Sequence, residues 1–471
     1  MSDLRRSEEE AARILEHFED RHKVFSYAVR GVSVWRILRF PISLAIQNIK
    51  LTTPAIPRRD LLCSVFGGLR KIFRLRRTCN YVAITYASAL RVQSSKGYDD
   101  IYFDALLNNL PGGVKISSLN APGYANRISK ASIAPVFDST IILVVSVILA
   151  RLFPVKDDAG IFAKIAECVL AELRLDEFSE TRIRRNFSAF WWRCVLYDLL
   201  LRRLSPEIVL AADAGQYPVI HACRRQGIRF VELQHGIFSP NHPDALPATA
   251  LSTDAEHLLL PDFVAMYGEY WVRRLKHTAV ARTGTLVAVG SSIIEQYRTM
   301  RQNLFCIDEK NLVLTLTTQG IEHGTLIHFM HSFLSNTSAS LQLNIKLHPA
   351  YDTSYDDYVA AFQKDVRVRI LRGREDPNTY ELIALSDVHL SISSACHFDA
   401  IGIGTPTVII ALGGFDLVRD LVRDGDAIVV STPEQLVDVV LHRHWLPITQ
   451  ETSNKYYQQN FVGNLKELLQ L

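Results

Sequence analysis

The segment SDVHLSISSACHFDAIGIGTPTVII, residues 386–410, contains a complete strand–helix–strand pattern. The run at 387–392 is largely apolar, as expected of a buried strand, and Ser393 and Ser394 follow it. A helical pattern then ends near Gly404, and a second apolar run occupies 407–411. Successive strands joined by a helix lie parallel in one sheet. The segment therefore predicts a parallel α/β sheet.

The same alternation extends along most of the chain. A first series of expected strands lies at 81–86, 207–212, 228–233, 263–268 and 286–290. A second series lies at 311–318, 343–348, 366–371, 387–392, 407–411 and 427–431. Helical patterns separate most of them, for example YPVIHACRRQG (217–227) and TPEQLVDVVLHRH (432–444). Strand–helix alternation places helices on both faces of a sheet.

Two such series predict two Rossmann-like, doubly wound domains, since 471 residues are too many for one ordinary core. We expect a helical, basic N-terminal extension at 1–80 and a first domain at 81–290. A second domain at 291–445 and a C-terminal helix at 446–471 complete the prediction, with the boundary just after Gly290.

Composition indicates a folded protein that stays inside the cell. The chain is 48% hydrophobic and 21% charged, and its charged N-terminus does not look like a secretory signal. Seven dispersed cysteines without a Cys-x-x-Cys pair are typical of reduced thiols and indicate no metal site. The most apolar run, IILVVSVILA at 141–150, has about half the length that crosses a bilayer. We expect it to form a buried helix.

Charge is distributed unevenly. Residues 21–80 hold 13 Lys and Arg against one acid, Asp60, so this segment carries +12 in a chain of net charge +3. Aromatic and aliphatic residues alternate with the basic ones in VWRILRF (34–40) and LRKIFRLRR (69–77). Such stretches suit the anionic inner face of a membrane. The alternative is a solvated helical face. Nucleic acid is not expected, because no recognised binding motif accompanies the charge.

Polar residues follow several strands of the second series. His348 and Pro349 end one strand, Gln319 and Gly320 end another, and Ser393 and Ser394 end a third. Hydroxyls and amides at a helix N-terminus can hold a phosphate, and an imidazole at a strand end can donate to one. The alternatives are ordinary turns for the first two pairs and helix capping for the serines.

Asp399 lies one to two turns into the helix that follows the serines, where it could reach a ribose hydroxyl or be a surface charge.

The first series contains a similar strand end in FVELQHGIFSPNHPDAL, residues 230–246. The apolar run stops at Gln234, His235 and Gly236, and His242 follows before Pro243. The segment is either a plain strand exit or a ligand site at the carboxyl edge of the sheet.

Five segments in order resemble bacterial surface-polysaccharide glycosyltransferases of the GT-B fold, which act in capsule and O-antigen synthesis. The segments are VELQHGIFSPNHPDAL, LPDFVAMYGEYW, LTLTTQG, IKLHPAY and LSISSACHFDAIGIGTPTVII. The His-Pro and Ser-Ser elements are similar to those of sialyl-, polysialyl- and Kdo transferases, which use CMP-sugars. They are also similar to those of CDP-glycerol glycerophosphotransferases. The resemblance covers about residues 200–435.

The resemblance implies a donor site in the second domain. His348 and the Ser393–Ser394 pair would hold the donor phosphate, with Pro349 fixing the turn after His348. Gln319 and Gly320 would line the same pocket, and Asp399 would face the ribose. Gln234 and His242 would lie on the acceptor side.

The catalytic base stays open among three residues. The resemblance implies an acidic pair and a glycine after a first-domain strand, but only one acid is present here, in Asp213-Ala214-Gly215. His235 ranks first, because a histidine is poised to accept a proton near neutral pH. Asp213 ranks second and Glu232, earlier in its strand, third.

These observations predict a glycosyltransferase that moves a sugar from a nucleotide donor to a surface polysaccharide or its lipid-linked precursor. The expected nucleotide of the donor is CMP. No metal and no cofactor are expected, because no Asp-x-Asp motif is present among the site candidates and the nucleotide-sugar is a substrate. The alternatives are a CDP-alcohol phosphotransferase, a sugar-nucleotide epimerase and a non-catalytic homologue. The expected location is the cytoplasm, peripheral on the inner face of the plasma membrane.

Overall fold

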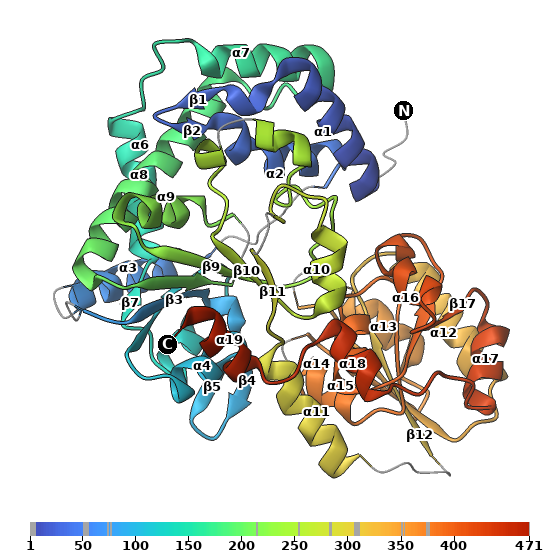
Figure 1. Cartoon of the computed structure of the whole chain (residues 1–471). Coiled ribbons are helices and arrows are strands. Elements are labelled where there is room, and N and C mark those ends of the chain that lie inside the picture. Colours follow the sequence, from blue (N-terminus) through green and yellow to red (C-terminus); the bar gives the residue numbers. More distant parts are fainter. Residues whose placement is uncertain are drawn as a thin grey trace. The chain divides into compact units, whose positions relative to one another are not determined.

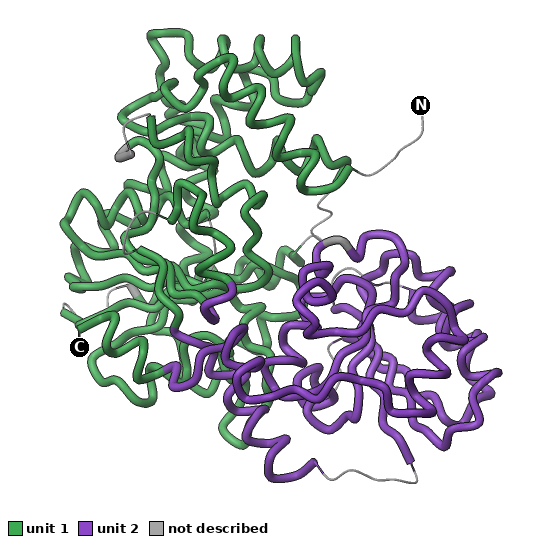
Figure 2. Tube along the Cα trace, turned by 45° about the vertical axis from the view of Figure 1, so that its right-hand side comes forward, with its two compact units in different colours: residues 1–266, 271–288, 462–471 green, residues 267–270, 289–461 purple. Residues whose placement is uncertain are grey.

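A computed structural model provides the three-dimensional structure of the chain. It describes residues 6–49, 56–72, 75, 78–212, 215–252, 255–281, 285–305, 311–349, 352, 354–373 and 377–470. The chain forms two compact units. Unit 1 comprises residues 1–266, 271–288 and 462–471, and unit 2 comprises 267–270 and 289–461 (Figure 2).

Unit 1 is built on a seven-stranded sheet in the order β11-β10-β9-β8-β3-β6-β7, with every neighbouring pair parallel. Its strands are β3 (Tyr81–Tyr86), β6 (Gly113–Ser118), β7 (Phe137–Asp138), β8 (Ile208–Ala211), β9 (Arg229–Leu233), β10 (Phe263–Met266) and β11 (Leu286–Ala288). The first three strands extend the sheet in one direction and the last four in the other. The order therefore reverses between β3 and β8.

Helices cover both faces of this sheet. Figure 1 shows α8 and α9 above it and α4 and α19 below it. The helices associated with unit 1 are α1 (Glu8–His22), α2 (Val34–Ile46), α3 (Arg58–Ile72), α4 (Asp104–Asn109), α5 (Ala125–Ser129), α6 (Thr140–Leu152), α7 (Ile161–Cys168), α8 (Glu180–Leu204), α9 (Tyr217–Gln226), α10 (Glu269–Leu275) and α19 (Phe461–Leu469). Two small antiparallel hairpins are formed by β1 (Ala28–Val29) with β2 (Val32–Ser33) and by β4 (Leu90–Ser94) with β5 (Gly97–Asp100).

The apolar run at 141–150 forms most of α6, and the expectation of a buried helix is only half correct. Ile141 and Ile142 are buried, whereas Val147 and Ile148 are 46% and 51% exposed. Within the ranges that the structure describes, no helix combines the length and the apolar character needed to span a membrane.

The basic N-terminal segment is not uniformly exposed, which corrects the simple amphipathic interpretation. Arg36 and Arg39, both on α2, are each only 2% exposed. Arg39 pairs with Glu19 of α1 at 2.6 Å and Arg36 pairs with Asp244 at 3.0 Å. These two cations stabilise the packing of α1 and α2 against the loop after β9, so a membrane cannot reach them.

Unit 2 contains a six-stranded parallel sheet in the order β14-β13-β12-β15-β16-β17. The strands are β12 (Leu312–Thr317), β13 (Leu341–Lys346), β14 (Val368–Leu371), β15 (Val388–Ser391), β16 (Thr407–Ile410) and β17 (Ile428–Val430). Numbered from β12, the order is 3-2-1-4-5-6, that of the doubly wound nucleotide-binding fold.

The strands of unit 2 are buried because helices pack on both faces. A core of Leu, Ile, Val and Phe side chains lies between the sheet and the helices α12 (His323–Asn336), α13 (Tyr355–Phe362) and α17 (Pro433–Leu441). The other helices are α11 (Ser292–Leu304), α14 (Thr379–Ala384), α15 (Cys396–Ile403), α16 (Arg419–Arg423) and α18 (Gln450–Tyr456). The two sheets confirm the predicted fold class of two Rossmann-like α/β domains.

Candidate functional site

The order of strands in unit 2 reverses between β12 and β15, which are hydrogen-bonded neighbours. Parallel strands on either side of such a reversal send their helices to opposite faces, and this leaves a crevice at their carboxyl ends. The segment 318–322 follows β12 and the segment 392–395 follows β15. The predicted donor residues Gln319, Gly320, Ser393 and Ser394 thus meet at one sheet edge.

Two hydrogen bonds join these segments directly. The Ser393 hydroxyl donates to Gln319 Oε1 at 3.1 Å, and Gln319 Nε2 donates to the Ser393 carbonyl at 3.4 Å. Gly320, with φ of 71°, makes the left-handed turn after Gln319. Both serines are largely buried, at 4% and 6% exposure. The structure therefore holds this strand-end pair in a fixed arrangement.

Ser394 has a clear local role. Its hydroxyl accepts a hydrogen bond from the Cys396 amide at 3.2 Å, at the start of α15. It is a turn contact and not the helix cap considered from the sequence, because the N-cap residue of α15 is Ala395, which has no side-chain cap. This local contact is compatible with phosphate binding, because a helix N-terminus carries a partial positive charge that an anion can share.

His348 and Pro349 lie on the other side of β12, just after β13. His348 is half-buried and Pro349 is exposed. Gly373 packs against this turn so closely that a Cβ there would lie 2.4 Å from the Pro349 nitrogen. The carboxyl ends of β13, β12 and β15 thus bring the three predicted polar pairs to adjacent positions.

A link between two of these segments was not predicted from the sequence. The hydroxyl of Thr318 donates to the buried carboxylate of Asp352, whose amide in turn donates to the His348 carbonyl at 3.4 Å. Thr318 follows β12 and Asp352 belongs to the loop after β13. The Thr318–Asp352 hydrogen bond therefore connects the turn that carries His348 to the turn that carries Gln319. The sequence did not indicate this link, because Asp352 is a single acidic residue in a loop.

Asp399 has a partner that the sequence did not reveal. Its carboxylate accepts a hydrogen bond from the Tyr457 hydroxyl at 2.5 Å. Burial, and then the negative charge of Asp399, raises the pKa of Tyr457 well above its usual range. Asp399 thus ties α15 to the segment after α18. Its predicted contact with a ribose stays a prediction.

A buried histidine pair lies beneath the serine turn. His389 of β15 and His397 of α15 are fully buried, and each places Nδ1 against the Thr407 hydroxyl, at 2.9 and 2.6 Å. His389 Nε2 also meets the Thr317 hydroxyl at 2.9 Å. Burial lowers the pKa of His397 to about 3 and that of His389 well below its ordinary value. Both rings are therefore neutral at physiological pH.

In unit 1 the reversal point lies between β3 and β8. Asp213, the second-ranked base, follows β8 and lies outside the described residues. Two positions further on, Gly215 has φ of 85°, and the Gln216 side chain donates to the Tyr86 hydroxyl at the end of β3. The two strand ends on either side of the reversal are thus joined by a side-chain hydrogen bond, as in unit 2.

The three residues predicted around β9 differ sharply in exposure. Glu232 lies in the strand and is 6% exposed, and Gln234 is 2% exposed with its amide donating to the Gly236 carbonyl at 2.8 Å. His235 is exposed, and the Tyr102 hydroxyl donates to its carbonyl at 3.2 Å. Gln234 therefore shapes the turn, whereas the imidazole of His235 is accessible to a substrate.

His242 belongs to a buried network. The Asp244 amide donates to His242 Nδ1 at 3.2 Å, and the Asp244 carboxylate accepts from Arg36 Nη1 at 3.0 Å and from the Tyr217 hydroxyl. The Arg36 guanidinium also stacks 4.4 Å above the Tyr217 ring. Burial lowers the pKa of His242, although Asp244 opposes the shift. The sequence showed His242 but not the α2 arginine that organises its loop.

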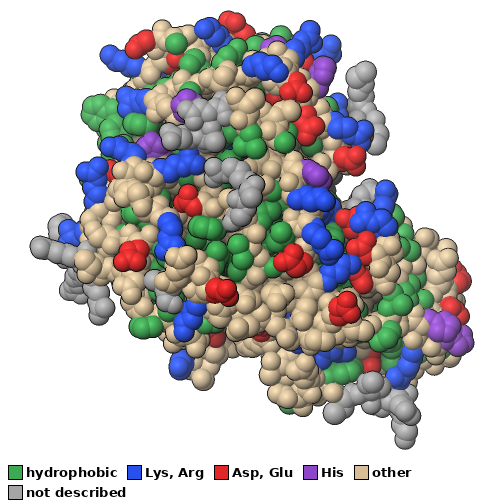
Figure 3. Space-filling view, in the orientation of Figure 1, with side chains coloured by type: hydrophobic (Ala, Val, Ile, Leu, Met, Phe, Trp, Pro, Cys, Tyr) green, Lys and Arg blue, Asp and Glu red, His purple; other side chains and the backbone are tan. Residues whose placement is uncertain are grey.

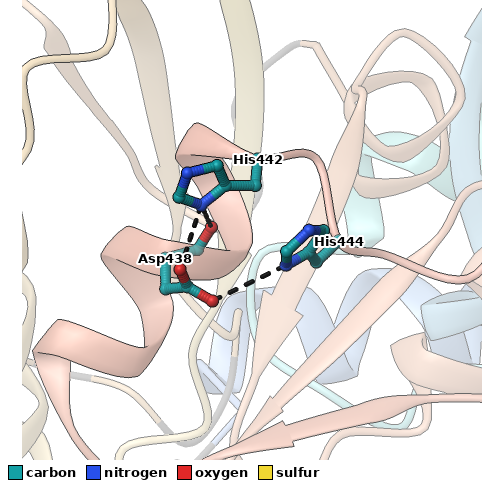
Figure 4. Close-up of side chains that lie close together, drawn as sticks. All are labelled: Asp438, His442 and His444. Atoms are coloured by element: carbon teal, nitrogen blue, oxygen red, sulfur yellow. Dashed lines mark hydrogen bonds and ion pairs between the residues drawn. The ribbon is translucent and has the colours of Figure 1, made fainter.

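A second kind of cluster lies elsewhere in unit 2. The Asp438 carboxylate of α17 lies 3.0 Å from His442 Nδ1 and 3.6 Å from His444 Nδ1 (Figure 4). Among the described residues this is the one group of three metal-ligating side chains close enough to share an ion, and all three are exposed. Because α17 runs back along the sheet from β17, its end lies at the edge opposite the strand ends that carry Gln319 and Ser393.

Comparisons with known proteins address the fold. No protein-family model matches the chain, and no curated protein matches its sequence. Among solved structures, a UDP-N-acetylglucosamine 2-epimerase is similar with a TM-score of 0.52 and 13% identity, over 84% of this chain and 96% of that one. A putative UDP-N-acetylglucosamine 2-epimerase from Listeria monocytogenes gives 0.50 and 12%, over 84% and 95%. The wall teichoic acid polymerase TagF gives 0.44 and 8%, over 94% and 98%.

These similarities define the class of fold. The chain has the GT-B fold of two Rossmann-like α/β domains, which the UDP-N-acetylglucosamine 2-epimerase structures share. Those two structures are named for UDP-N-acetylglucosamine, a nucleotide-linked sugar.

Proposed function

We propose that this protein is a glycosyltransferase that takes a sugar from a nucleotide donor bound at the carboxyl edge of the unit 2 sheet. One observation carries the proposal: Gln319 and Ser393 are hydrogen-bonded to each other across the reversal between β12 and β15. In doubly wound sheets this position is where nucleotides bind. The GT-B fold is consistent with that assignment.

The proposed donor contacts use the groups that surround this point. Ser393, Ser394 and the start of α15 would hold the donor phosphate, since the helix dipole and hydroxyl donors favour an anion. His348, on the neighbouring strand end, would donate to the same phosphate. The binding needs no metal in this scheme. CMP is the first nucleotide to test, because the sequence motifs resemble those of transferases that use CMP-sugars.

Nucleotide binding provides the direct test. The full chain is heated with CMP, CDP, UDP or GDP, and the ligand that stabilises it is the one bound, since the shift grows with the logarithm of concentration over Kd. His348→Ala and Ser393→Ala should each weaken binding by about 1–3 kcal/mol, the cost of a lost hydrogen bond to a charged group. The controls His328→Ala and Ser335→Ala alter exposed residues of α12. Unchanged affinity in both site variants refutes the assignment.

We propose His235 as the base that deprotonates the acceptor hydroxyl. Among the described candidates its imidazole is exposed, whereas Glu232 is buried within β9. His235→Asn should keep nucleotide binding and lower turnover by about 10²–10⁴, the usual contribution of a positioned base. Asp213→Asn is measured beside it. Loss of activity in the Asp213 variant alone would make Asp213 the base.

A hydrolysing sugar-nucleotide epimerase is the second candidate, favoured by the fold shared with two structures named as UDP-N-acetylglucosamine 2-epimerases. Incubation with UDP-N-acetylglucosamine and no acceptor separates the two functions. Release of UDP with a changed sugar configuration supports the epimerase. Release that requires an added glycan or lipid-linked acceptor supports the transferase.

Two further alternatives give different products. A CDP-alcohol phosphotransferase would release CMP from CDP-glycerol. A non-catalytic homologue would bind nucleotide without turnover.

The acceptor we propose is a surface polysaccharide or its lipid-linked precursor. Such acceptors lie at the inner face of the plasma membrane, so the enzyme would work from the cytoplasm while bound peripherally. The basic N-terminal segment supports this location through its charge. Activity measured with acceptor extracted into detergent and with acceptor in vesicles would test it.

A further inference from the structure

Helix α3 packs against the rest of unit 1 through its smallest side chains. Gly68 is buried, and a Cβ on it would lie 2.6 Å from the Asp138 carbonyl oxygen and 3.1 Å from an Ile141 methyl group. The buried Ser64 hydroxyl donates to the Asp138 carboxylate and lies 3.1 Å from the Thr140 hydroxyl. The two most buried residues of α3 are therefore small, and the larger Leu61 and Val65 beside them are half-buried.

Three large apolar side chains of α3 point outward. Leu62, Phe66 and Leu69 are 55%, 59% and 43% exposed. At about 3.6 residues per turn they form one stripe, on the side of the helix opposite Ser64 and Gly68. A surface helix of a water-soluble domain normally has the reverse pattern, with its apolar stripe facing the core. We call Leu62, Phe66 and Leu69 the outer stripe.

Basic side chains border the outer stripe. Arg58 lies along one side of it and Arg59 and Arg70 along the other, and all three are exposed. Asp60 is the single acid in the 15 residues of α3. An apolar stripe between rows of arginines matches a membrane interface, where apolar groups enter the acyl boundary and cations meet lipid phosphates.

The neighbouring helix α6 adds exposed apolar groups. Val147, Ile148 and Leu152 are 46%, 51% and 65% exposed, and Phe153, just after the helix, is 58% exposed. Arg151 is exposed among them. Figure 3 shows apolar side chains next to Lys and Arg side chains at the upper left of the molecule, over the α6 region of Figure 1. The two helices touch where Gly68 meets Ile141.

We propose that the outer stripe of α3 is the membrane-docking element, and that it lies in the headgroup region of an anionic bilayer. This inference rests on the proposed peripheral location and makes it specific. The proposal assigns membrane docking to α3 and not to α2, because Arg36 and Arg39 of α2 are buried in ion pairs. Charge complementarity selects an anionic lipid surface rather than a second copy of this chain, because two copies would bring their arginines together.

Vesicle co-sedimentation of the full chain tests the proposal. Leu62→Ser with Phe66→Ser should lower binding to phosphatidylglycerol vesicles by at least about tenfold, because two apolar anchors leave the interface. Arg59→Glu with Arg70→Glu should act similarly at low salt and less at high salt. The matched control is Leu304→Ser, which alters a leucine of α11 in unit 2 with 61% exposure. It should bind as the parent does.

A second measurement needs no substitution. Cys63 is exposed on α3 beside the outer stripe. Alkylation of Cys63 by a maleimide, followed by peptide mass spectrometry, should slow in the presence of anionic vesicles and not in the presence of phosphatidylcholine vesicles.

The outcomes separate this proposal from its competitors. Undiminished vesicle binding by the Leu62/Phe66 variant, or equal protection of Cys63 by neutral vesicles, overturns it. A concentration-dependent dimer that the same variant abolishes, without vesicle binding, assigns the stripe to a second copy and also overturns it. Nucleotide-induced thermal shifts of the variant should match those of the parent. A parent without any nucleotide shift would refute the proposed donor site and leave the vesicle result standing.

Discussion

The buried pair of Arg36 and Asp244 offers the sharpest test of how unit 1 is held together. Asp244 is 5% exposed, and its carboxylate accepts from Arg36 at 3.0 Å and from the Tyr217 hydroxyl. Burial acts to raise its pKa, but Arg36, His242 and these hydrogen bonds hold the pKa below the ordinary value. Asp244 is therefore charged in the folded protein. Asp244→Asn removes that charge and leaves the Arg36 guanidinium buried without a counter-ion.

The expected cost follows from that geometry. Breaking a buried ion pair by neutralising one partner costs about 3–5 kcal/mol, because the remaining charge stays out of water. In a domain of this size, 1 kcal/mol corresponds to about 2–4 °C, so the first thermal transition should fall by roughly 6–20 °C. The double variant Arg36→Met with Asp244→Asn should recover part of the loss, since it removes the stranded charge as well.

Calorimetric melting curves of the parent, both single variants and the double variant measure these effects. Asp438→Asn provides the matched control, because Asp438 pairs with two histidines at the surface, and such pairs contribute about 0–1 kcal/mol. A change below about 1 °C for Asp244→Asn, or a double variant that loses the sum of the two single losses, would show that the pair does not stabilise unit 1 in this way.

Three further predictions concern pH, backbone geometry and thiol chemistry. Burial in the folded protein lowers the pKa values of His389 and His397 below those in the unfolded chain. The contribution of the two neutral histidines to the free energy of unfolding is therefore fully present above about pH 6.5, and it falls by about 1.4 kcal/mol per pH unit for each histidine as the pH is lowered. Urea titrations between pH 7 and 5 should show this slope, and His397→Gln should reduce it; an unchanged slope would contradict the assignment. Gly290→Ala should destabilise unit 2 by at least about 2 kcal/mol, because φ is 96° and a Cβ would lie 2.1 Å from the Gln458 carbonyl oxygen. The cost is read from urea midpoints, and a midpoint equal to that of the parent would rule out this close contact. Cys63 should react with a thiol reagent within minutes in the native protein, whereas Cys79, whose pKa burial raises to about 11, should react after unfolding. Equal rates for the two peptides would contradict the burial of Cys79.

Most strands of the two parallel sheets were predictable from the sequence, whereas β6 and β7 were not, and β6 shows the reason. Short apolar runs between helical patterns located β3, β8, β9, β10, β11 and the six strands of unit 2. The strand β6 has the sequence GVKISS and was missed, because Lys115 and the serines break its apolar pattern. In the structure Lys115 is buried and pairs with Asp104 at 2.5 Å. Its charge is neutralised by a residue of α4, and a local pattern cannot show that partner.

The residues of the candidate site were visible in the sequence, but their arrangement was not. Glycines, serines and a histidine after apolar runs identified the turns, because strand ends carry the polar groups of parallel sheets. Gln319 and Ser393 lie 74 positions apart, and only the strand order makes them neighbours. Asp352 and Tyr457 gave no signal at all, since their roles depend on partners in other loops.

The N-terminal segment shows most clearly what the sequence determines and what the tertiary structure decides. Sequence alone determined that it is basic and amphipathic, because charge and apolar content are properties of composition. Tertiary structure decided which arginines are buried in ion pairs and which helix face reaches solvent. Arg36 and Arg39 of α2 pack inward, while α3 turns Leu62, Phe66 and Leu69 outward over a contact that only Gly68 allows. The direction of a helix face is set by what packs against it, and that information lies in contacts between segments distant in the chain.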